Sequence, residues 1–313
     1  MIASRAASAW ATHAERGSLL LLRMMSWISL RLGRRASRSV LYGIAAYFFL
    51  FAPRARRHVR EYLQRVLGRP ATPIDRFRQI LAFASTIHDR VYLLNQRFEE
   101  FDISVEGAAL LRAAAADGNG ALLVGAHLGS FEVTRALGQR QAGLDIAMAM
   151  YADNARKINA VLAAISPQGK LDIIELGQMS AMLAIRARLD AGSFVGMLGD
   201  RTLGDEPIER VMFLGAEASF PLGPMRAAAM LRRPVYFMTG LYLGGNRYRI
   251  VFEQIADFST LAPSDRAISV SAAVHQYAAI LERHCRAFPY NWFNFLDFWQ
   301  IHPSAVLPST TQE

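Results

Sequence analysis

The sequence predicts an α/β layered domain, with a largely parallel central sheet flanked by helices, behind an N-terminal membrane-associated helical region. Beyond residue 100, short apolar runs that suit buried strands alternate with amphipathic stretches that suit helices, an order typical of parallel βαβ units. Before residue 70, two apolar runs stand among many arginines. We therefore divide the chain into a basic, apolar helical region over 1–70, an α/β domain over 71–303 and a disordered tail over 304–313.

The positive charge of the chain is concentrated at the N-terminus. Residues 1–70 contain thirteen arginines and two glutamates, a net charge of +11, whereas the whole chain carries +9. A nucleic-acid-binding protein would usually carry its basic stripe on the folded domain itself, so we predict no nucleic-acid partner. Cys285 is the one cysteine, which excludes an intrachain disulfide and a cysteine metal site and fits a reducing, cytoplasmic setting.

The two N-terminal apolar runs cover residues 17–30 and 39–53, and arginines bracket both of them. Each run is shorter than the roughly 18 to 20 apolar residues that a spanning helix needs. Basic groups at the ends of interfacial helices are attracted to an anionic cytoplasmic leaflet. We therefore expect helices that lie on the membrane surface; the alternative is a buried hairpin whose arginines extend into water.

Hydrophobic periodicity gives the elements of the domain. We expect helices over 73–94, 129–138, 154–165, 179–189, 223–231 and 268–287. We expect strands over 121–126, 146–150, 171–176 and 193–198, a short strand over 212–214, and a hairpin of strands over 234–243 and 247–255.

The segment from Gly125 to Glu132 carries the residues most suited to chemistry. His127 follows a buried strand, and Glu132 lies in the first turn of the next expected helix. In an open α/β sheet the functional crevice lies beyond the carboxyl ends of the strands. A carboxylate at this spacing can return to one imidazole nitrogen and fix its tautomer, leaving the other nitrogen to take a proton. Backbone amides near Gly129 and Ser130, at a helix N-terminus, could bind an oxyanion.

Other interpretations of this segment are weaker. A zinc site would need further ligands at helical spacing, and no His-Glu-x-x-His motif is present, so we predict no metal. A serine nucleophile elbow is excluded because histidine occupies the centre of Gly125-Ala126-His127-Leu128-Gly129. A polar pair that merely caps a helix stays open. Nucleotide-binding glycine motifs are absent from the sequence, so we expect no soluble cofactor.

Several motifs follow one another along the chain in the order of a known superfamily. The spacing of His127 and Glu132 resembles the His-x4-Asp/Glu motif of the lysophospholipid acyltransferases, in particular the bacterial branch of lipid A late acyltransferases. The later motifs in that order are Gly199-Asp200-Arg201, the run from Phe213 to Pro224, and Trp292-Phe293. The aromatic ending over 289–299 is similar to a sister group linked to aryl-polyene-type lipids.

The resemblance implies roles for residues outside the His127 segment. It implies a glycerolipid-acyltransferase-like fold, a basic oxyanion donor at Arg156 or Lys157, and a substrate clamp at Asp200 and Arg201. It also implies an acceptor-lining segment that contains Phe213, Gly215, Pro221 and Gly223. The alternatives without a functional role are a solvated helix face for Arg156 and Lys157, a surface ion pair for Asp200 and Arg201, and a plain turn at Pro221 and Gly223. The aromatic ending suits core packing, or contact with an acyl chain or membrane.

The predicted function is therefore transfer of a fatty or polyene acyl chain from acyl carrier protein to a hydroxyl of a membrane lipid, with His127 as base and Glu132 as its partner. The expected location is the cytoplasmic face of a bacterial inner membrane. One alternative is a lysophospholipid or glycerol-phosphate acyltransferase that uses acyl-CoA. The alternative from another class is a catalytically silent lipid-binding protein of the same fold.

Overall fold

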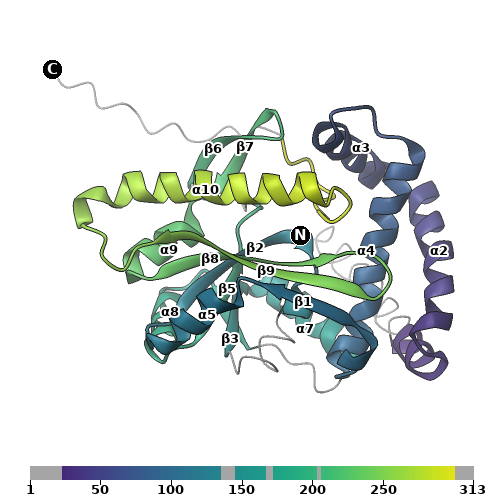
Figure 1. The fold of residues 1–313 in the computed structure, drawn as a ribbon, viewed down its shortest axis with the longest axis horizontal. Helices are drawn as coiled ribbons and strands as arrows, with labels where there is room; N and C mark the ends of the chain where they lie inside the picture. Colours follow the sequence, from purple (N-terminus) through teal and green to yellow (C-terminus); the bar gives the residue numbers. More distant parts are fainter. Residues whose placement is uncertain (1–22, 135–144, 167–171, 203–205, 300–313) are drawn as a thin grey trace, which may run out of the picture.

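A computed structural model describes residues 23–134, 145–166, 172–202 and 206–299. The expected tail over 304–313 and the start of the first apolar run, residues 17–22, lie outside the described residues, as does most of the helix expected over 129–138. The described residues form a mixed α/β fold with helices packed around a central sheet (Figure 1), which confirms the predicted α/β domain with a largely parallel sheet.

Seven strands of the described residues form the central sheet, in the order β1-β9-β8-β2-β5-β3-β4. Neighbouring strands run parallel except for β8 and β9, which form the predicted antiparallel hairpin. The strands are β1 (Asp102–Glu106), β2 (Ala121–Gly129), β3 (Ile146–Tyr151), β4 (Ile173–Leu176), β5 (Phe194–Leu198), β8 (Pro234–Tyr242) and β9 (Arg247–Asp257). A separate hairpin, β6 (Ile208–Phe213) with β7 (Ala216–Pro221), replaces the short strand expected over 212–214.

Helices cover both faces of the sheet, because alternate residues of each strand point to opposite faces. On β2, Leu122 and Val124 face one core with residues of α3, α8, α9 and α10, whereas Ala121 and Leu123 face the other with residues of α4 and α5. The helices are α2 (Arg34–Phe51), α3 (Pro53–Leu67), α4 (Pro73–Leu94), α5 (Ala108–Ala116), α7 (Ala152–Ile165), α8 (Met179–Asp190), α9 (Gly223–Leu231) and α10 (Arg266–Ala287).

Helix α4 begins and ends where the sequence predicts. Thr72 and Asp75 form a reciprocal capping box: the Thr72 hydroxyl accepts from the Asp75 amide, and the Asp75 carboxylate accepts from the Thr72 amide. Such a box satisfies two of the N–H groups that a helix start leaves unpaired. Helix α4 lies between the sheet and the N-terminal helices (Figure 1).

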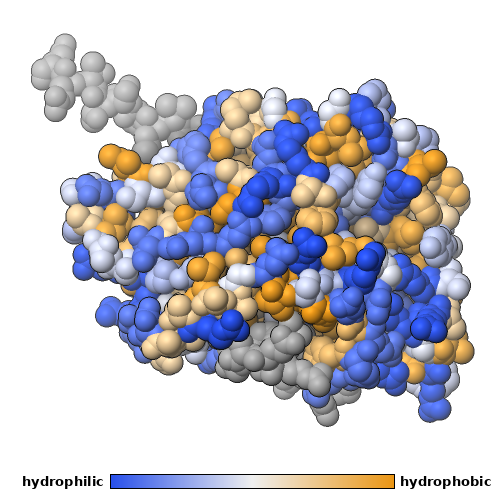
Figure 2. All heavy atoms as spheres, viewed as in Figure 1, coloured by the Kyte–Doolittle hydropathy of each residue, from blue (hydrophilic) through white to orange (hydrophobic). Residues whose placement is uncertain are grey.

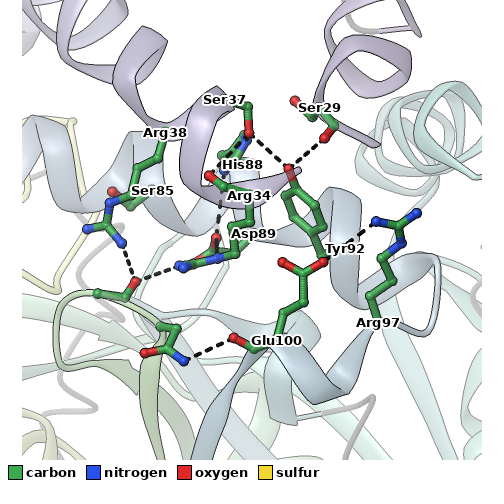
Figure 3. A network of polar contacts seen from close by, with 12 residues as sticks. Ser29, Arg34, Ser37, Arg38, Ser85, His88, Asp89, Tyr92, Arg97 and Glu100 are labelled. Atoms are coloured by element: carbon green, nitrogen blue, oxygen red, sulfur yellow. Dashed lines mark hydrogen bonds and ion pairs between the residues drawn. The ribbon is translucent and has the colours of Figure 1, made fainter. Parts of the chain in front are cut away.

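The N-terminal helix α2 packs along α4 through a buried polar network (Figure 3). Arg34 of α2 makes a two-pronged ion pair with Asp89 of α4, at 2.8 and 2.9 Å, and the Tyr248 hydroxyl of β9 donates to the same carboxylate at 2.7 Å. The Ser37 hydroxyl lies 2.9 Å from both His88 Nε2 and the Tyr92 hydroxyl. The inner face of α2 is therefore fixed to the domain.

The outer face of α2 is apolar and exposed, and arginines lie beside it. Figure 2 shows hydrophobic and hydrophilic side chains intermixed over the surface that α2 and α3 form in Figure 1. The exposed apolar side chains of α2 are Val40, Tyr42, Tyr47, Phe48, Leu50 and Phe51. Within the described part of the chain, no helix has both the length and the apolar character needed to cross a bilayer.

Candidate active site

Two neighbouring parallel strands bring His127 and Asp200 together. In the register of β2 and β5, Gly125 lies opposite Leu198. His127 lies two positions after Gly125, and Asp200 lies two positions after Leu198. Parallel strands end at the same edge of the sheet, which is where α/β proteins carry their functional residues. The imidazole Nδ1 of His127 lies 2.8 Å from Oδ1 of Asp200.

The Asp200 carboxylate is fully buried and accepts from three donors. Besides His127 Nδ1, the backbone amide of His127 and the indole Nε1–H of Trp292 both donate to Oδ2 at 2.9 Å. Burial by itself raises the pKa of the Asp200 carboxyl, but the charge of His127, its hydrogen bonds and the charge of Arg201 outweigh burial and hold this pKa below its usual value. An ionised carboxylate has no proton to give, so Nδ1 of His127 carries the hydrogen of this bond and Nε2 is the basic nitrogen.

The backbone around His127 is held by the segment that follows α10. The Gly129 amide donates to the Asn291 carbonyl at 2.8 Å, and the Phe293 amide donates to the His127 carbonyl at 2.7 Å. Gly129 has φ +72°, and a Cβ there would lie 2.2 Å from the Gly240 carbonyl oxygen. Glycine is therefore required for this close approach.

These backbone contacts correct the expected oxyanion site. The Gly129 amide is already bonded to Asn291, and the Ser130 amide donates to the Gly240 carbonyl at 2.8 Å. A donor satisfied by a carbonyl of its own chain does not point at a substrate oxyanion. The backbone amides of Gly129 and Ser130 are therefore already occupied by backbone carbonyls and are not oxyanion donors in this structure.

Glu132 has partners other than those that the sequence spacing suggested. Its Oε2 lies 2.9 Å from Nε of Arg90 on α4, and the Ser130 hydroxyl donates to the same oxygen at 3.3 Å. Nδ1 of His127 is bonded to Asp200 instead. Instead of the expected hydrogen bond with Glu132, the imidazole Nδ1–H donates to Asp200, a residue 73 positions along the chain from His127.

Arg201, Arg156 and Lys157 all follow strands at the same edge of the sheet. The Arg201 guanidinium is partly buried; Nε donates to Asn294 Oδ1 at 3.2 Å and Nη2 to the Phe293 carbonyl at 3.4 Å. Arg201 therefore bridges Asp200 to the segment that holds the His127 backbone. Arg156 and Lys157 lie near the start of α7, which follows β3; Arg156 is exposed, and the side chain of Lys157 is outside the described set.

The segment from Phe213 to Gly223 forms a hairpin and the start of a helix. Phe213 is fully buried, and its ring centroid lies 5.5 Å from that of Trp292. Gly215, at φ +80°, forms the turn between β6 and β7. Pro221 ends β7 and Gly223 begins α9. Phe213 thus packs directly behind the tryptophan that holds Asp200.

The model of one protein family, described as bacterial lipid A biosynthesis acyltransferase, matches residues 10–300. The chain belongs to this family. A comparison with curated proteins finds no match. Membership confirms the resemblance to the lipid A branch and places the protein among the acyltransferases that act on lipids.

Trp292 contacts the Asp200 carboxylate that pairs with His127, and the sequence did not reveal this contact. As a motif it matched the family order, but nothing local to it pointed to Asp200, 92 positions away. Its indole is fully buried among the rings of Tyr62, Phe213 and Phe298. The aromatic ending thus packs in the core, one of the two roles considered for it, and Trp292 also donates to the carboxylate that pairs with His127.

Chelating agents are expected to leave the activity of the protein within about twofold of its untreated value, because the proposed base needs no metal-activated water. Among the described residues, the potential ligand atoms of His58, Glu61 and Asp297 lie within 4.8 Å of one another. The measurement is the acyl-transfer rate after exhaustive dialysis against EDTA, with His58→Ala as the comparison. Loss of activity in EDTA that zinc or magnesium restores, and that His58→Ala reproduces, would contradict the prediction.

Proposed function

We propose that the protein moves a fatty acyl chain, or a related polyene acyl chain, from an acyl-carrier-protein thioester to a hydroxyl group of a membrane lipid. The observation that carries this proposal is the His127–Asp200 hydrogen bond at the carboxyl edge of the sheet, in a chain that belongs to a lipid acyltransferase family. Such a pair supplies the base that acyl transfer to a hydroxyl requires. The His127 side chain is 27% exposed, so the ring is open to substrate while its partner is buried.

The proposed reaction proceeds in two proton-balanced steps. Nε2 of His127 takes the proton of the acceptor hydroxyl as its oxygen attacks the thioester carbonyl carbon. The tetrahedral intermediate then collapses, the carbon–sulfur bond breaks, and the thiolate takes the proton from the imidazolium. Asp200 stabilises the imidazolium between the two steps without itself becoming protonated. The products are an ester of the acceptor and the free thiol of the donor.

The proposal is tested by supplying two donors with the same radiolabelled acyl chain. The purified protein is incubated with a bacterial inner-membrane lipid extract and either acyl-carrier-protein thioester or coenzyme A thioester. We expect label to enter the lipid fraction as an alkali-labile ester, faster from the carrier protein. Faster transfer from coenzyme A to added lysophospholipid would favour the alternative of an acyl-CoA-dependent lysophospholipid acyltransferase. Lipid binding without any transfer would identify a silent lipid-binding protein.

We propose further that the outer face of α2 contacts the cytoplasmic face of an anionic inner membrane. Tyr47, Phe48 and Phe51 are 59%, 52% and 69% exposed, and they form one aromatic group with ring centroids 5.0 and 5.7 Å apart. Exposed arginines flank this face at Arg31, Arg35, Arg57 and Arg60. Aromatic side chains that enter the interface, together with arginines attracted to anionic headgroups, make a surface-lying helix bind.

Point substitutions test the membrane surface better than a deletion of residues 1–70. That deletion would remove Arg34 and leave the buried Asp89 carboxylate without its cation. We expect the triple change Tyr47→Ser, Phe48→Ser and Phe51→Ser to weaken flotation with phosphatidylglycerol liposomes at least about tenfold, because interfacial binding scales with buried apolar area. Added salt should weaken binding of the unmodified protein, because charges are screened beyond about 8 to 10 Å.

A matched control removes equally exposed apolar side chains elsewhere. Leu183, Met212 and Ile268 are 68%, 66% and 76% exposed and lie on α8, β6 and α10. Their replacement by serine should leave flotation unchanged. Equal flotation of the unmodified protein and the α2 triple variant would assign membrane contact to another surface.

A further inference from the structure

The negative charge of Glu132 is paired with the positive charge of Arg90, a residue from a distant part of the chain. The Glu132 carboxylate is 10% exposed, and the Arg90 side chain that faces it is 27% exposed. The two atoms in contact, Arg90 Nε and Glu132 Oε2, are 2.9 Å apart. Within the described ranges, the Nε–H of Arg90 has no hydrogen-bond acceptor, so charge attraction and not a directed hydrogen bond holds this pair.

Arg90 stands beside the residue that fixes α4 to the N-terminal helices. Asp89, its neighbour in sequence, is 1% exposed and pairs with Arg34 (Figure 3). The same carboxylate also accepts from the Tyr248 hydroxyl. Successive residues of an α-helix point about 100° apart, since a turn takes about 3.6 residues. At one level of α4, therefore, the Asp89 side chain binds α2 and β9, and the Arg90 side chain binds the segment that carries His127.

The Arg90–Glu132 pair holds the far end of the His127 segment, residues 127–132, which runs from the end of β2 into the following helix. Hydrogen bonds from Gly129 and Ser130 to Asn291 and Gly240 fix the backbone in the middle of this segment. The near end is fixed by the His127 amide, which donates to Asp200. The ion pair with α4 adds a charged contact where the segment enters the following helix.

We propose that Arg90 is a positioning residue that acts on His127 through the motif carboxylate of Glu132, and that Glu132 is not the proton-relay partner of His127. The pair joins the His127 segment to α4, which the Arg34–Asp89 network in turn joins to the N-terminal helices. This inference rests on the proposed acyl transfer. One charge interaction sets the position of the base, and a different carboxylate, Asp200, supports the proton transfer.

Arg90→Met is expected to lower kcat about 10- to 10²-fold with little change in KM for the thioester, because displacement of a base by about 1 Å can cost 10²-fold. Arg90→Lys keeps the charge and should stay within about threefold of the unmodified rate. The double variant Arg90→Met with Glu132→Gln should lose no more than the worse single variant, since both changes break one interaction. A proton-relay role for Glu132 predicts losses that add instead.

Arg97→Met is the matched control. Arg97 pairs with Glu100 at 3.6 Å just beyond α4, on the surface, so its loss should leave kcat unchanged. Thermal melting of every variant shows whether the fold is kept, and Arg90→Lys and the double variant remain informative where Arg90→Met destabilises the protein.

A second measurement does not need activity. Carbethoxylation of His127 by diethyl pyrocarbonate, followed by mass spectrometry, reports how the ring is presented. We expect its rate in Arg90→Met to rise by at least about threefold, because a segment released at one end opens more often. The rate in Arg90→Lys and Arg97→Met should match the unmodified protein. Unchanged labelling in Arg90→Met, or additive rate losses in the double variant, would overturn this proposal. An unmodified protein that transfers no acyl group would overturn the proposed function alone.

Discussion

Replacing His127 by alanine is expected to lower the rate of acyl transfer by about 10²- to 10⁴-fold, the range associated with removal of a general base. The side chain is partly exposed, so its removal opens no core cavity. The Asp200 carboxylate loses one donor but keeps the His127 backbone amide and the Trp292 indole. The fold should therefore persist at a cost of about 1 to 3 kcal/mol, the usual penalty for a buried polar group that loses a partner.

The measurement for His127→Ala is kcat/KM with labelled thioester and lipid acceptor, together with the melting temperature. His275→Ala is the control, because this histidine is exposed on α10 and its ring nitrogen is bonded to the helix itself. Near-normal turnover by a well-folded His127→Ala protein would remove the proposed mechanism.

Asp200→Asn is expected to cost about 10²- to 10⁴-fold in the same assay, for a different reason. Asparagine has the size of aspartate, but it replaces one acceptor oxygen by an NH₂ donor. That donor faces the N–H groups of His127 or Trp292, all of which need an acceptor. If the amide donates to Nδ1, the ring proton moves to Nε2, which can then no longer take the proton of the acceptor hydroxyl.

Folding of Asp200→Asn has to be checked because the position is fully buried. Asp172→Asn, at a half-exposed surface ion pair with Arg188, is the matched control and should keep full activity. An Asp200→Asn protein that folds and turns over normally would show that this hydrogen bond is dispensable.

The local pattern of the sequence was enough for the elements that carry a clear hydrophobic period. Helices α4 and α9 begin and end at the predicted residues, and the predicted strands of the sheet were found within a few residues. Strands β1 and β7 and helix α5 were not predicted. β1 has only two apolar residues, Ile103 and Val105, and α5 is mostly alanine, so the hydrophobic period of each is too short or too weak to stand out.

The partner of His127 depends on strand order, which the sequence does not reveal. Glu132 was favoured because it lies five residues away, whereas Asp200 becomes a neighbour only because β5 pairs with β2. The resemblance implied a substrate clamp at Asp200 and Arg201, but the contact between Asp200 and His127 was not predicted. The Gly129 and Ser130 amides failed as oxyanion donors for the same reason, since the carbonyls that occupy them come from distant segments.

The most direct test of the account compares Asp200→Asn with Glu132→Gln in one acyl-transfer assay, on protein of verified fold. We predict that Asp200→Asn loses at least about tenfold more kcat/KM than Glu132→Gln, because the first change disturbs the proton transfer and the second disturbs only the position of the base. The reverse order, with Glu132→Gln the more damaging change, would contradict the assignment of Asp200 as the partner of His127.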